Sequence, residues 1–273
     1  MQPVDQPFHK ARVVVTGGTR GSGAGIARAF LRAGAHVLVC GRAEPAALPD
    51  ADGRAAAFTP ADVRDPEQAR RLIATATELF GGVDVVISNA GGSPEAAAAT
   101  ASPRFHAKII ELNLTAPLHV AQAANEVMQA QPGGGSIIMI GSVSGSRPSP
   151  GTAAYGAAKA GLHHLVTSLA IEWGPKVRIN TVIPGFVATE SPAEVYGDEE
   201  TAAAIAATVP LGRMATPDDV ADACLFLASA QAAYVSGACL TLHGGGERPA
   251  FHSVRPPGPR GPASGDAGED RAG

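Results

Sequence analysis

The stretch VVVTGGTRGSGAG, residues 13–25, joins a short apolar run to a glycine-rich turn and then to a helical pattern. Gly17, Gly21 and Gly23 give the turn the spacing GxxxGxG. Glycine lets a chain turn tightly and lets a pyrophosphate approach the backbone, and the N-terminus of the next helix offers free N–H groups. After the first strand of an α/β pattern, such a turn predicts a dinucleotide site. On this stretch alone, a plain tight turn remains the alternative.

Outside this stretch, apolar runs of strand length alternate with helical patterns. The runs are almost continuously apolar, which is typical of strands covered on both faces. The alternation predicts an α/β fold with a doubly wound parallel sheet, the Rossmann fold, in a single domain. The expected strands are 12–16, 35–40, 55–59, 84–88, 136–141, 177–183 and 238–242.

Two of the expected helices carry start signals. Asp65 is the expected N-cap of a helix over 66–80, and Gln68 is expected to complete its capping box. Leu79 is expected on the inner face of that helix. Thr216 and Asp219 repeat the same capping logic before the pattern PDDVADACLFLA.

The composition limits the partners and the compartment. The chain has 273 residues, a net charge of −4 and 45% hydrophobic residues, which favours neither nucleic acid nor an anionic membrane as a partner. No signal peptide or apolar spanning run is seen, and no Cys/His cluster has metal-ligand spacing, so no metal is expected. Cys40, Cys224 and Cys239 are predicted to be buried free thiols of a cytoplasmic protein.

The chain is predicted to divide near residue 246. Residues 1–246 are predicted to form one dinucleotide-binding domain. Residues 247–273 are rich in proline and glycine, and their apolar periodicity ends near Phe251. We expect this part to be a mostly disordered tail, with docking of its first residues as the alternative.

The run AAYGAAKAG, residues 153–161, sets one phenol and one amine among small residues. Tyr155 and Lys159 are four residues apart, so in a helix they share a face about 6 Å apart along the axis. A tyrosine with a pKa near 10 is a poor acid or base at neutral pH unless a nearby ammonium stabilises its phenolate. Taken alone, the pair favours a core or interface tyrosine with a snorkelling lysine over a catalytic pair.

The end of the second strand indicates which dinucleotide would bind. An NAD site usually has Asp or Glu there, to accept hydrogen bonds from the ribose 2′-hydroxyl. Here the residues are Cys40, Gly41 and Arg42, and Arg20 lies in the glycine-rich turn. Two guanidiniums suit a 2′-phosphate, so the sequence predicts NADP, with NAD as the less favoured cofactor. Arg42 as a merely solvated residue is the alternative.

Further polar groups follow other strands, where ligands bind in open α/β sheets. Together with the turn and the Tyr/Lys pair, this set resembles the short-chain dehydrogenase/reductase family, in particular its 3-oxoacyl-carrier-protein reductases. The resemblance covers residues 10–246 and includes the following motifs: TGxxxGxG at 16–23, NAG at 89–91, Asn113, Ser142 with Tyr155 and Lys159, and PGxxxT at 184–189.

The resemblance implies hydride transfer. Tyr155 would be the general acid or base, Lys159 would lower its pKa and hold the nicotinamide ribose, Ser142 would orient the substrate oxygen, and Asn113 would anchor a relay water. Asp62 would reach the adenine, and the Val187 backbone with Thr189 would hold the carboxamide. The implied cofactor residues are Gly17, Thr19, Arg20, Gly21, Ser22, Gly23, Arg42, Asp62, Val63, Asn89, Ala90, Gly91, Tyr155, Lys159, Pro184, Gly185, Val187 and Thr189.

The chain departs from the family pattern at Ser22, Ser88 and His243, of which the last bears on assembly. His163 and His164 are expected to pack, not to catalyse. The implied substrate segment, 186–212, lacks Arg and Lys, which favours a neutral ketone or secondary alcohol as the small-molecule substrate. A 3-oxoacyl-carrier-protein or polyketide-type reductase is the alternative, and a nonenzymatic dinucleotide-binding regulator is the alternative of another class. The resemblance also implies a homotetramer or homodimer.

Overall fold

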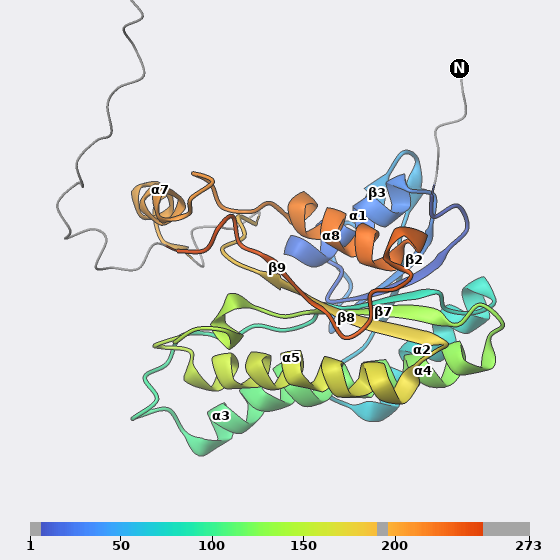
Figure 1. The fold of residues 1–273 in the computed structure, drawn as a ribbon, viewed down its shortest axis with the longest axis horizontal. Helices are drawn as coiled ribbons and strands as arrows, with labels where there is room; N and C mark the ends of the chain where they lie inside the picture. Colours follow the sequence, from blue (N-terminus) through green and yellow to red (C-terminus); the bar gives the residue numbers. More distant parts are fainter. Residues whose placement is uncertain (1–6, 190–195, 248–273) are drawn as a thin grey trace, which may run out of the picture.

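The computed structural model describes residues 7–189 and 196–247. Its central element is a parallel sheet of seven strands in the order β5-β2-β1-β6-β7-β8-β9 (Figure 1). The strand order changes direction between β1 and β6, so the sheet is doubly wound as predicted. Val14 lies in register with Leu38 on one side and Val86 on the other. The strands are β1 (Arg12–Thr16), β2 (His36–Gly41), β5 (Ala57–Pro60), β6 (Val85–Ser88), β7 (Gly135–Ile140), β8 (Val177–Pro184) and β9 (Cys239–Leu242).

The expected strand over 55–59 is placed differently. Residues 54–55 belong to a small antiparallel hairpin, formed by β3 (Asp50–Ala51) and β4 (Arg54–Ala55). The parallel edge strand β5 begins only at Ala57, which lies in register with Leu38.

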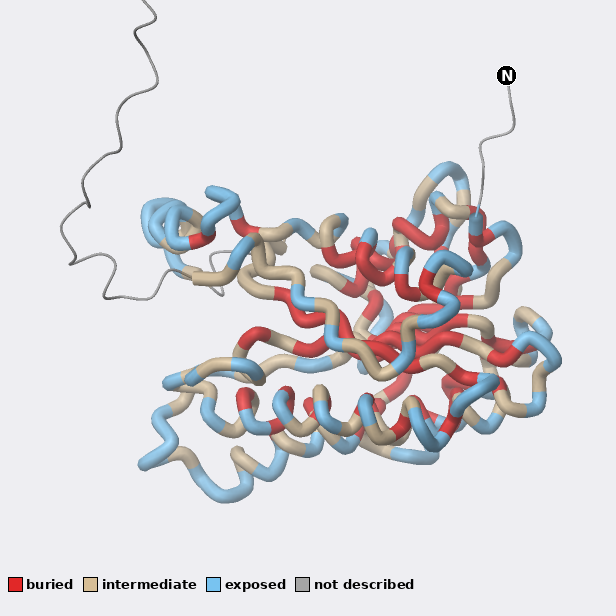
Figure 2. Tube along the Cα trace, in the orientation of Figure 1, coloured by how far each residue is buried: buried red, intermediate tan, exposed pale blue. Residues whose placement is uncertain are grey.

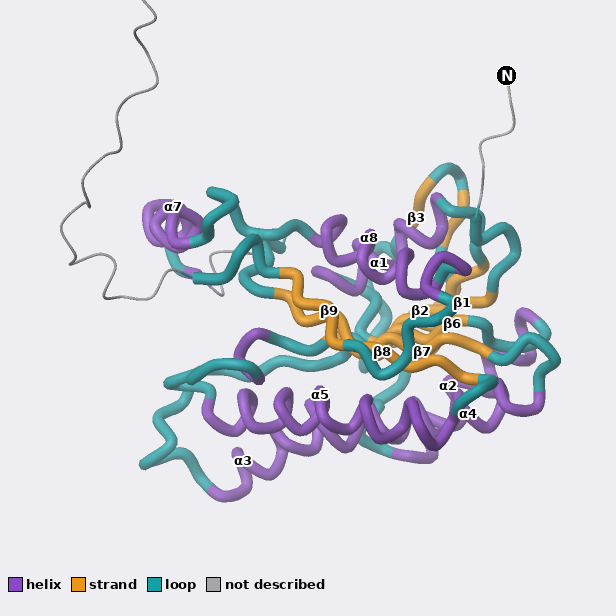
Figure 3. The backbone as a smooth tube through the Cα atoms, in the orientation of Figure 1, coloured by secondary structure: helices purple, strands orange, loops and turns teal. Residues whose placement is uncertain are grey.

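Helices cover both faces of the sheet (Figures 1 and 3). On one face lie α1 (Gly21–Arg32) and α8 (Pro217–Ala228), and on the other α2 (Pro66–Phe80), α4 (Ala116–Ala130) and α5 (Ala153–Trp173). Shorter elements complete the fold. They are α3 (Pro103–Ile110), the π-helix η1 (Glu111–Thr115), the 3-10 helices η2 (Val143–Gly145) and η3 (Ala230–Ala232), and α7 (Glu199–Thr208).

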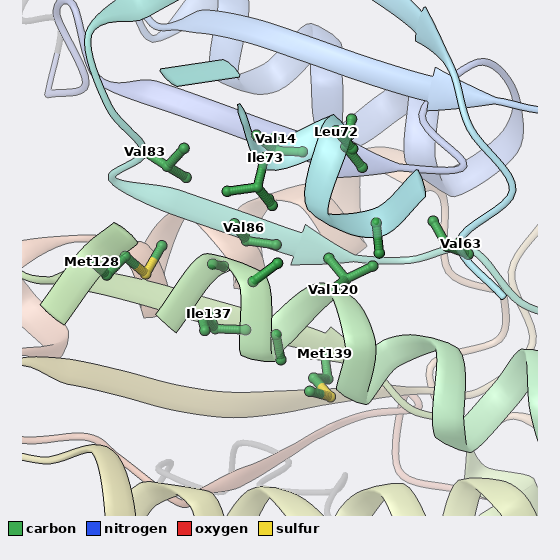
Figure 4. Packing of buried hydrophobic residues seen from close by; sticks show 14 of the residues in the cluster. Val14, Val63, Leu72, Ile73, Val83, Val86, Val120, Met128, Ile137 and Met139 are labelled. Carbon is green, nitrogen blue, oxygen red and sulfur yellow. The ribbon is translucent and has the colours of Figure 1, made fainter. Parts of the chain in front are cut away.

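The central strands are buried at successive positions, and alternate side chains pack on opposite faces of the sheet (Figure 2). Val14 and Val86 face the layer of α2 and α4, where Leu72 and Val120 are also buried (Figure 4). Val13 and Val15 face α1 and α8 instead. Because both faces are covered, the central strands carry apolar residues at successive positions, which explains the continuous apolar runs.

The helix caps confirm most of the expected signals. Asp65 caps α2 by accepting from the N–H groups of Glu67 and Gln68. The capping box predicted there is wrong, because the Gln68 Oε1 accepts from the Asp62 N–H and so serves the preceding loop. Leu79 is 56% exposed, so its predicted inward position is also wrong. In α8, Thr216 forms the full capping box.

Two of the three predicted buried thiols are buried. Cys40 and Cys224 lie in the core, but Cys239 is exposed because β9 is an edge strand. Within residues 7–189 and 196–247, no helix is long and apolar enough to cross a membrane. The predicted tail from residue 248 onward lies outside the described residues.

Candidate active site at the carboxyl edge of the sheet

The turn after β1 has the backbone that its glycines predict. Gly17 has a φ of +60°. A Cβ on Gly23 would lie 2.3 Å from the Gly17 carbonyl oxygen, so only glycine fits there. Thr16 links this turn to the end of β6, because its Oγ1 accepts hydrogen bonds from the N–H groups of Asn89 and Ala90. Thr16 is not among the expected site residues. A close approach of backbone to a ligand is therefore sterically open at this turn.

A cavity of about 860 Å³ opens over the turn and the ends of β1, β2 and β6. Most of the predicted cofactor residues line it, together with some that the sequence did not single out. The predicted ones are Gly17, Thr19, Arg20, Gly21, Ser22, Gly23, Arg42, Asp62, Val63, Asn89, Ala90, Gly91 and Thr189. The others are Cys40, Gly41, Ala43, Pro45, Ala61, Arg64 and Leu112.

The adenosine end of this cavity, as the resemblance would assign it, is lined by three arginines and one carboxylate. Arg64 binds Asp62 through Nε and Nη2, with Nε 2.9 Å from Oδ1. This contact, together with the more distant charge of Arg42, lowers the pKa of Asp62. Arg20 and Arg42 line the same cavity. Arg64 directly follows Val63 in the sequence, but only the folded loop reveals its pairing.

Asn113 lies fully buried in the π-helix η1 and joins it to the loop after β6. Its Nδ2 donates to the carbonyls of Gly92 and Ile109, and its Oδ1 accepts from the Gly92 N–H, each at 2.9 Å. A Cβ on Gly91 would lie 2.8 Å from the Asn113 Oδ1 and 3.4 Å from the Lys159 Nζ. The structure therefore brings Asn113, Gly91 and Lys159 together, although they lie far apart in the sequence.

Tyr155 and Lys159 share one face of α5, as the spacing predicts. The Lys159 Nζ donates to the Ile140 carbonyl at 2.8 Å and lies 5.6 Å from the centre of the Tyr155 ring. Burial lowers the pKa of Lys159 to about 8. Burial also raises the pKa of Tyr155, partly offset by the Ser142 hydroxyl. Lys159 is not among the causes of the Tyr155 shift in the free protein, in which its Nζ is bound to the Ile140 carbonyl, so its expected effect on the Tyr155 pKa stays a prediction.

The Ser142 loop packs against α5. The Ser142 Oγ accepts from the Ser144 N–H, and the Ser142 N–H donates to His163 Nε2 at 3.5 Å. Burial, then the nearby Lys159 charge, lowers the pKa of His163 to about 4. A neutral imidazole next to the loop agrees with the expectation that His163 packs and does not exchange protons at neutral pH.

The segment after β8 carries the remaining predicted residues. Pro184 ends the strand, and Gly185 donates its N–H to the Leu242 carbonyl. The Cβ of His243 lies beside Gly185. His243, one of the departures from the family pattern, therefore packs where the last strand, β9, meets the end of β8. Val187 pairs with Ala215, and Thr189 contacts the glycine-rich turn at Gly21. Pro184, Gly185, Val187, Tyr155 and Lys159 are not among the described residues that line the cavity.

Two further contacts border this segment. Arg147, from the loop between Ser142 and Tyr155, lies 5.9 Å over the Phe186 ring and pairs with Glu247 at 2.7 Å. Phe186 meets Tyr196 edge to face. In the described parts of the chain no cluster of three metal-ligating side chains occurs. Residues 190–195 of the expected substrate segment lie outside the described residues.

The chain is similar in sequence and in fold to known oxidoreductases. The family described as "Enoyl-(Acyl carrier protein) reductase" matches residues 17–247. The chain is 38% identical to an L-rhamnose 1-dehydrogenase (NAD(P)(+)) of Azotobacter vinelandii, covering 85% of this chain and 95% of the relative. It is 34% identical to a 3alpha-hydroxysteroid dehydrogenase of Mediterraneibacter gnavus, covering 85% and 94%. A short-chain type dehydrogenase/reductase of Mycobacterium marinum has a similar solved structure, with a TM-score of 0.82 and 31% identity over 90% of this chain and 98% of that one.

Proposed function

Since the chain belongs to the short-chain dehydrogenase/reductase family of oxidoreductases, we propose that it transfers a hydride between NADP and a ketone or secondary alcohol. The observation that carries this proposal is the meeting of Ser142, Tyr155, Lys159 and Asn113 next to the cavity over the glycine-rich turn. Relatives that act on a sugar and on a steroid alcohol support the reaction class.

The cavity fits a phosphorylated dinucleotide. Gly17 and Gly23 leave no room for a Cβ, which suits a pyrophosphate held close to the backbone and to the N-terminus of α1. Arg20 and Arg42 would hold a 2′-phosphate by charge-assisted hydrogen bonds, and Asp62 would receive the adenine amino group. Val187 and Thr189 would hold the nicotinamide carboxamide. When bound, the dinucleotide supplies or accepts the hydride.

The proton steps fall to the protein. In reduction, the Tyr155 hydroxyl would give its proton to the substrate carbonyl oxygen, and in oxidation its phenolate would take the proton of the alcohol. Ser142 would hold the same oxygen by a hydrogen bond. Lys159 would stabilise the phenolate, and Asn113 would hold the loop that adjoins both. The raised pKa of Tyr155 in the free protein favours the protonated form, which is the form that reduction needs.

The charges around the expected substrate end support a neutral substrate. Arg147 is a cation that lies over the Phe186 ring of this segment, and its guanidinium is paired with Glu247. This pairing leaves less positive charge for a small anionic substrate. We propose an uncharged ketone or alcohol; a carrier-bound 3-oxoacyl thioester, whose reacting group is also uncharged, is the alternative to be included in a substrate screen.

The test is a pair of measurements on wild type and Tyr155→Phe. NADPH oxidation with a panel of ketones, sugars and acyl thioesters gives turnover, and quenching of protein fluorescence gives NADPH affinity. We expect Tyr155→Phe to lose turnover and to keep NADPH affinity within about twofold, since only a proton donor is removed. Turnover in the variant at the wild-type rate would refute the role of Tyr155. Binding without turnover of any substrate would favour the regulator.

Assembly and compartment are part of the same proposal. We propose a homotetramer or homodimer in the cytoplasm; the assembly is supported by exposed apolar residues such as Ile171 on α5 and Phe226 on α8. Light scattering of the purified chain tests the assembly, and a monomer at micromolar concentration would refute it.

A further inference from the structure

The hydroxyl of Tyr196 forms hydrogen bonds with both the backbone N–H and the backbone carbonyl of Val187. The Val187 N–H donates to Tyr196 Oη at 3.0 Å, and the same hydroxyl donates to the Val187 carbonyl at 3.2 Å. The ring is held from the side by Phe186, edge to face with centroids 5.9 Å apart. Burial raises the pKa of Tyr196, so its hydroxyl keeps the proton that it donates.

The pairing of Val187 with Ala215 explains why the N–H and carbonyl of Val187 are both available to Tyr196. In the bridge between Val187 and Ala215, the hydrogen bonds come from the flanking residues: Ala215 donates to the Phe186 carbonyl, and Ala188 donates to the Ala215 carbonyl. In a parallel bridge of this kind, the central residue's own N–H and C=O point away from the partner strand. Here they point to Tyr196, whose hydroxyl supplies a hydrogen-bond partner for both half-buried groups.

Tyr196 also lies close to the reacting end of the site. A phenolate at Tyr196 would raise the pKa of Tyr155, so the two side chains lie within electrostatic range of each other. The cavity follows the turn and reaches Gly91 and Thr189, but neither Val187 nor Tyr155 is among its described lining residues. In the free protein, the Tyr196 hydroxyl therefore takes up the Val187 backbone groups, outside the described lining of the cavity.

A primary carboxamide matches the Val187 pair, because it carries one N–H donor group and one carbonyl acceptor. We propose that Tyr196 competes with the nicotinamide carboxamide for the Val187 backbone and so sets the affinity for that half of the cofactor. This rests on the proposed function, in which Val187 holds the carboxamide. Binding of the nicotinamide half breaks two hydrogen bonds of the free protein and moves the Tyr196 hydroxyl away from Val187.

The substitution Tyr196→Phe tests this, because it keeps the ring on Phe186 and removes only the hydroxyl. The variant's free state loses the two bonds to Val187, whereas its nicotinamide-bound state loses nothing. We expect NADPH to bind at least about fivefold more tightly to the variant, because its free state lacks two neutral hydrogen bonds that each contribute a factor of about two or more. Adenosine 2′,5′-bisphosphate, which lacks the nicotinamide half, is expected to bind wild type and variant equally.

Both ligands are measured by isothermal titration calorimetry, with Tyr234→Phe as the matched control because Tyr234 is fully exposed. The control is expected to change neither affinity. Unchanged or weaker NADPH binding to Tyr196→Phe, or an equal shift for both ligands, would overturn the competition while leaving the proposed function intact. Failure of wild type to bind either ligand would overturn the proposed function and the competition together.

Discussion

Arg64 holds the Asp62 carboxylate by two side-chain nitrogens and its own backbone N–H, at the adenosine end of the cavity. Asp62 also feels the charge of Arg42, the residue proposed for the 2′-phosphate. The carboxylate is therefore within electrostatic range of two guanidiniums, of which Arg64 makes the direct contact. This arrangement leaves Arg42 able to turn toward a phosphate.

Removing Arg64 is expected to redirect Arg42. In Arg64→Ala, Asp62 would attract Arg42, and its charge would also repel a 2′-phosphate. We expect the affinity for NADPH to fall about tenfold, because the charge-assisted hydrogen bond between Arg42 and the 2′-phosphate would be weakened. The affinity for NADH, which has no 2′-phosphate, should fall less. Fluorescence titration of both dinucleotides measures this. The control is Arg71→Ala, an exposed arginine of α2. An equal loss for NADPH and NADH would show that Arg64 only supports the fold of the loop.

Asn113 is expected to matter for stability as well as for activity. Its side chain makes three hydrogen bonds inside the protein, and Asn113→Ala would leave the N–H and C=O of Gly92 and the Ile109 carbonyl without this partner. We expect a loss of about 2–3 kcal/mol in the free energy of unfolding. Urea unfolding measures it, with the partly exposed Asn125→Ala as control. A loss below that of the control would mean that the π-helix does not depend on this side chain.

Much of the fold follows from local sequence signals, and the site follows only in part. The apolar strands and the cap at Thr216 are local features, and so is the i, i+4 relation of Tyr155 and Lys159. The Arg64–Asp62 pair depends on the conformation of one loop. The Arg147–Glu247 pair joins residues a hundred positions apart, a relation that no sequence period encodes.

The errors in prediction also have physical causes. Leu79 is exposed although it fits the apolar period of α2, and the neighbouring Phe80 packs on the His36 ring instead. Gln68 has the position of a capping-box residue, but a nearby loop N–H takes its side-chain oxygen. The direction of the Tyr155 pKa shift depends on burial, which spacing alone does not measure.

Lys159 is expected to cost stability at neutral pH. Burial lowers its pKa to about 8, below the value of about 10.4 in an unfolded chain. The unfolded chain therefore binds the proton more tightly, so stability rises with pH between these two values and the cost is greatest below pH 8. We expect Lys159→Met to raise the free energy of unfolding by about 1–2 kcal/mol at neutral pH, net of the lost bond to Ile140, and to abolish turnover.

Urea unfolding of wild type and Lys159→Met at neutral pH and near pH 10 tests the sign. The difference between the two proteins is expected to shrink at the higher pH, because the wild-type amine is then neutral in the folded state. The exposed Lys108→Met serves as control and should show no such trend. A variant that is less stable than wild type at both pH values would mean that the ammonium and its bond to Ile140 stabilise the fold.

Arg42 is expected to decide between the two dinucleotides. It follows β2 at the position where an NAD site would have a carboxylate, and it lines the cavity together with Arg20. Arg42→Ala removes a charged donor to the 2′-phosphate, so we expect NADPH affinity to fall about 10- to 100-fold while NADH affinity changes less than twofold. The exposed Arg104→Ala of α3 is the control. Increasing salt should weaken NADPH binding to wild type more than to Arg42→Ala, since the ionic contact is then screened. Equal affinity of wild type for the two dinucleotides would instead mean that Arg42 is a solvated residue that does not bind the 2′-phosphate. NAD would then be the cofactor to use in the substrate screen.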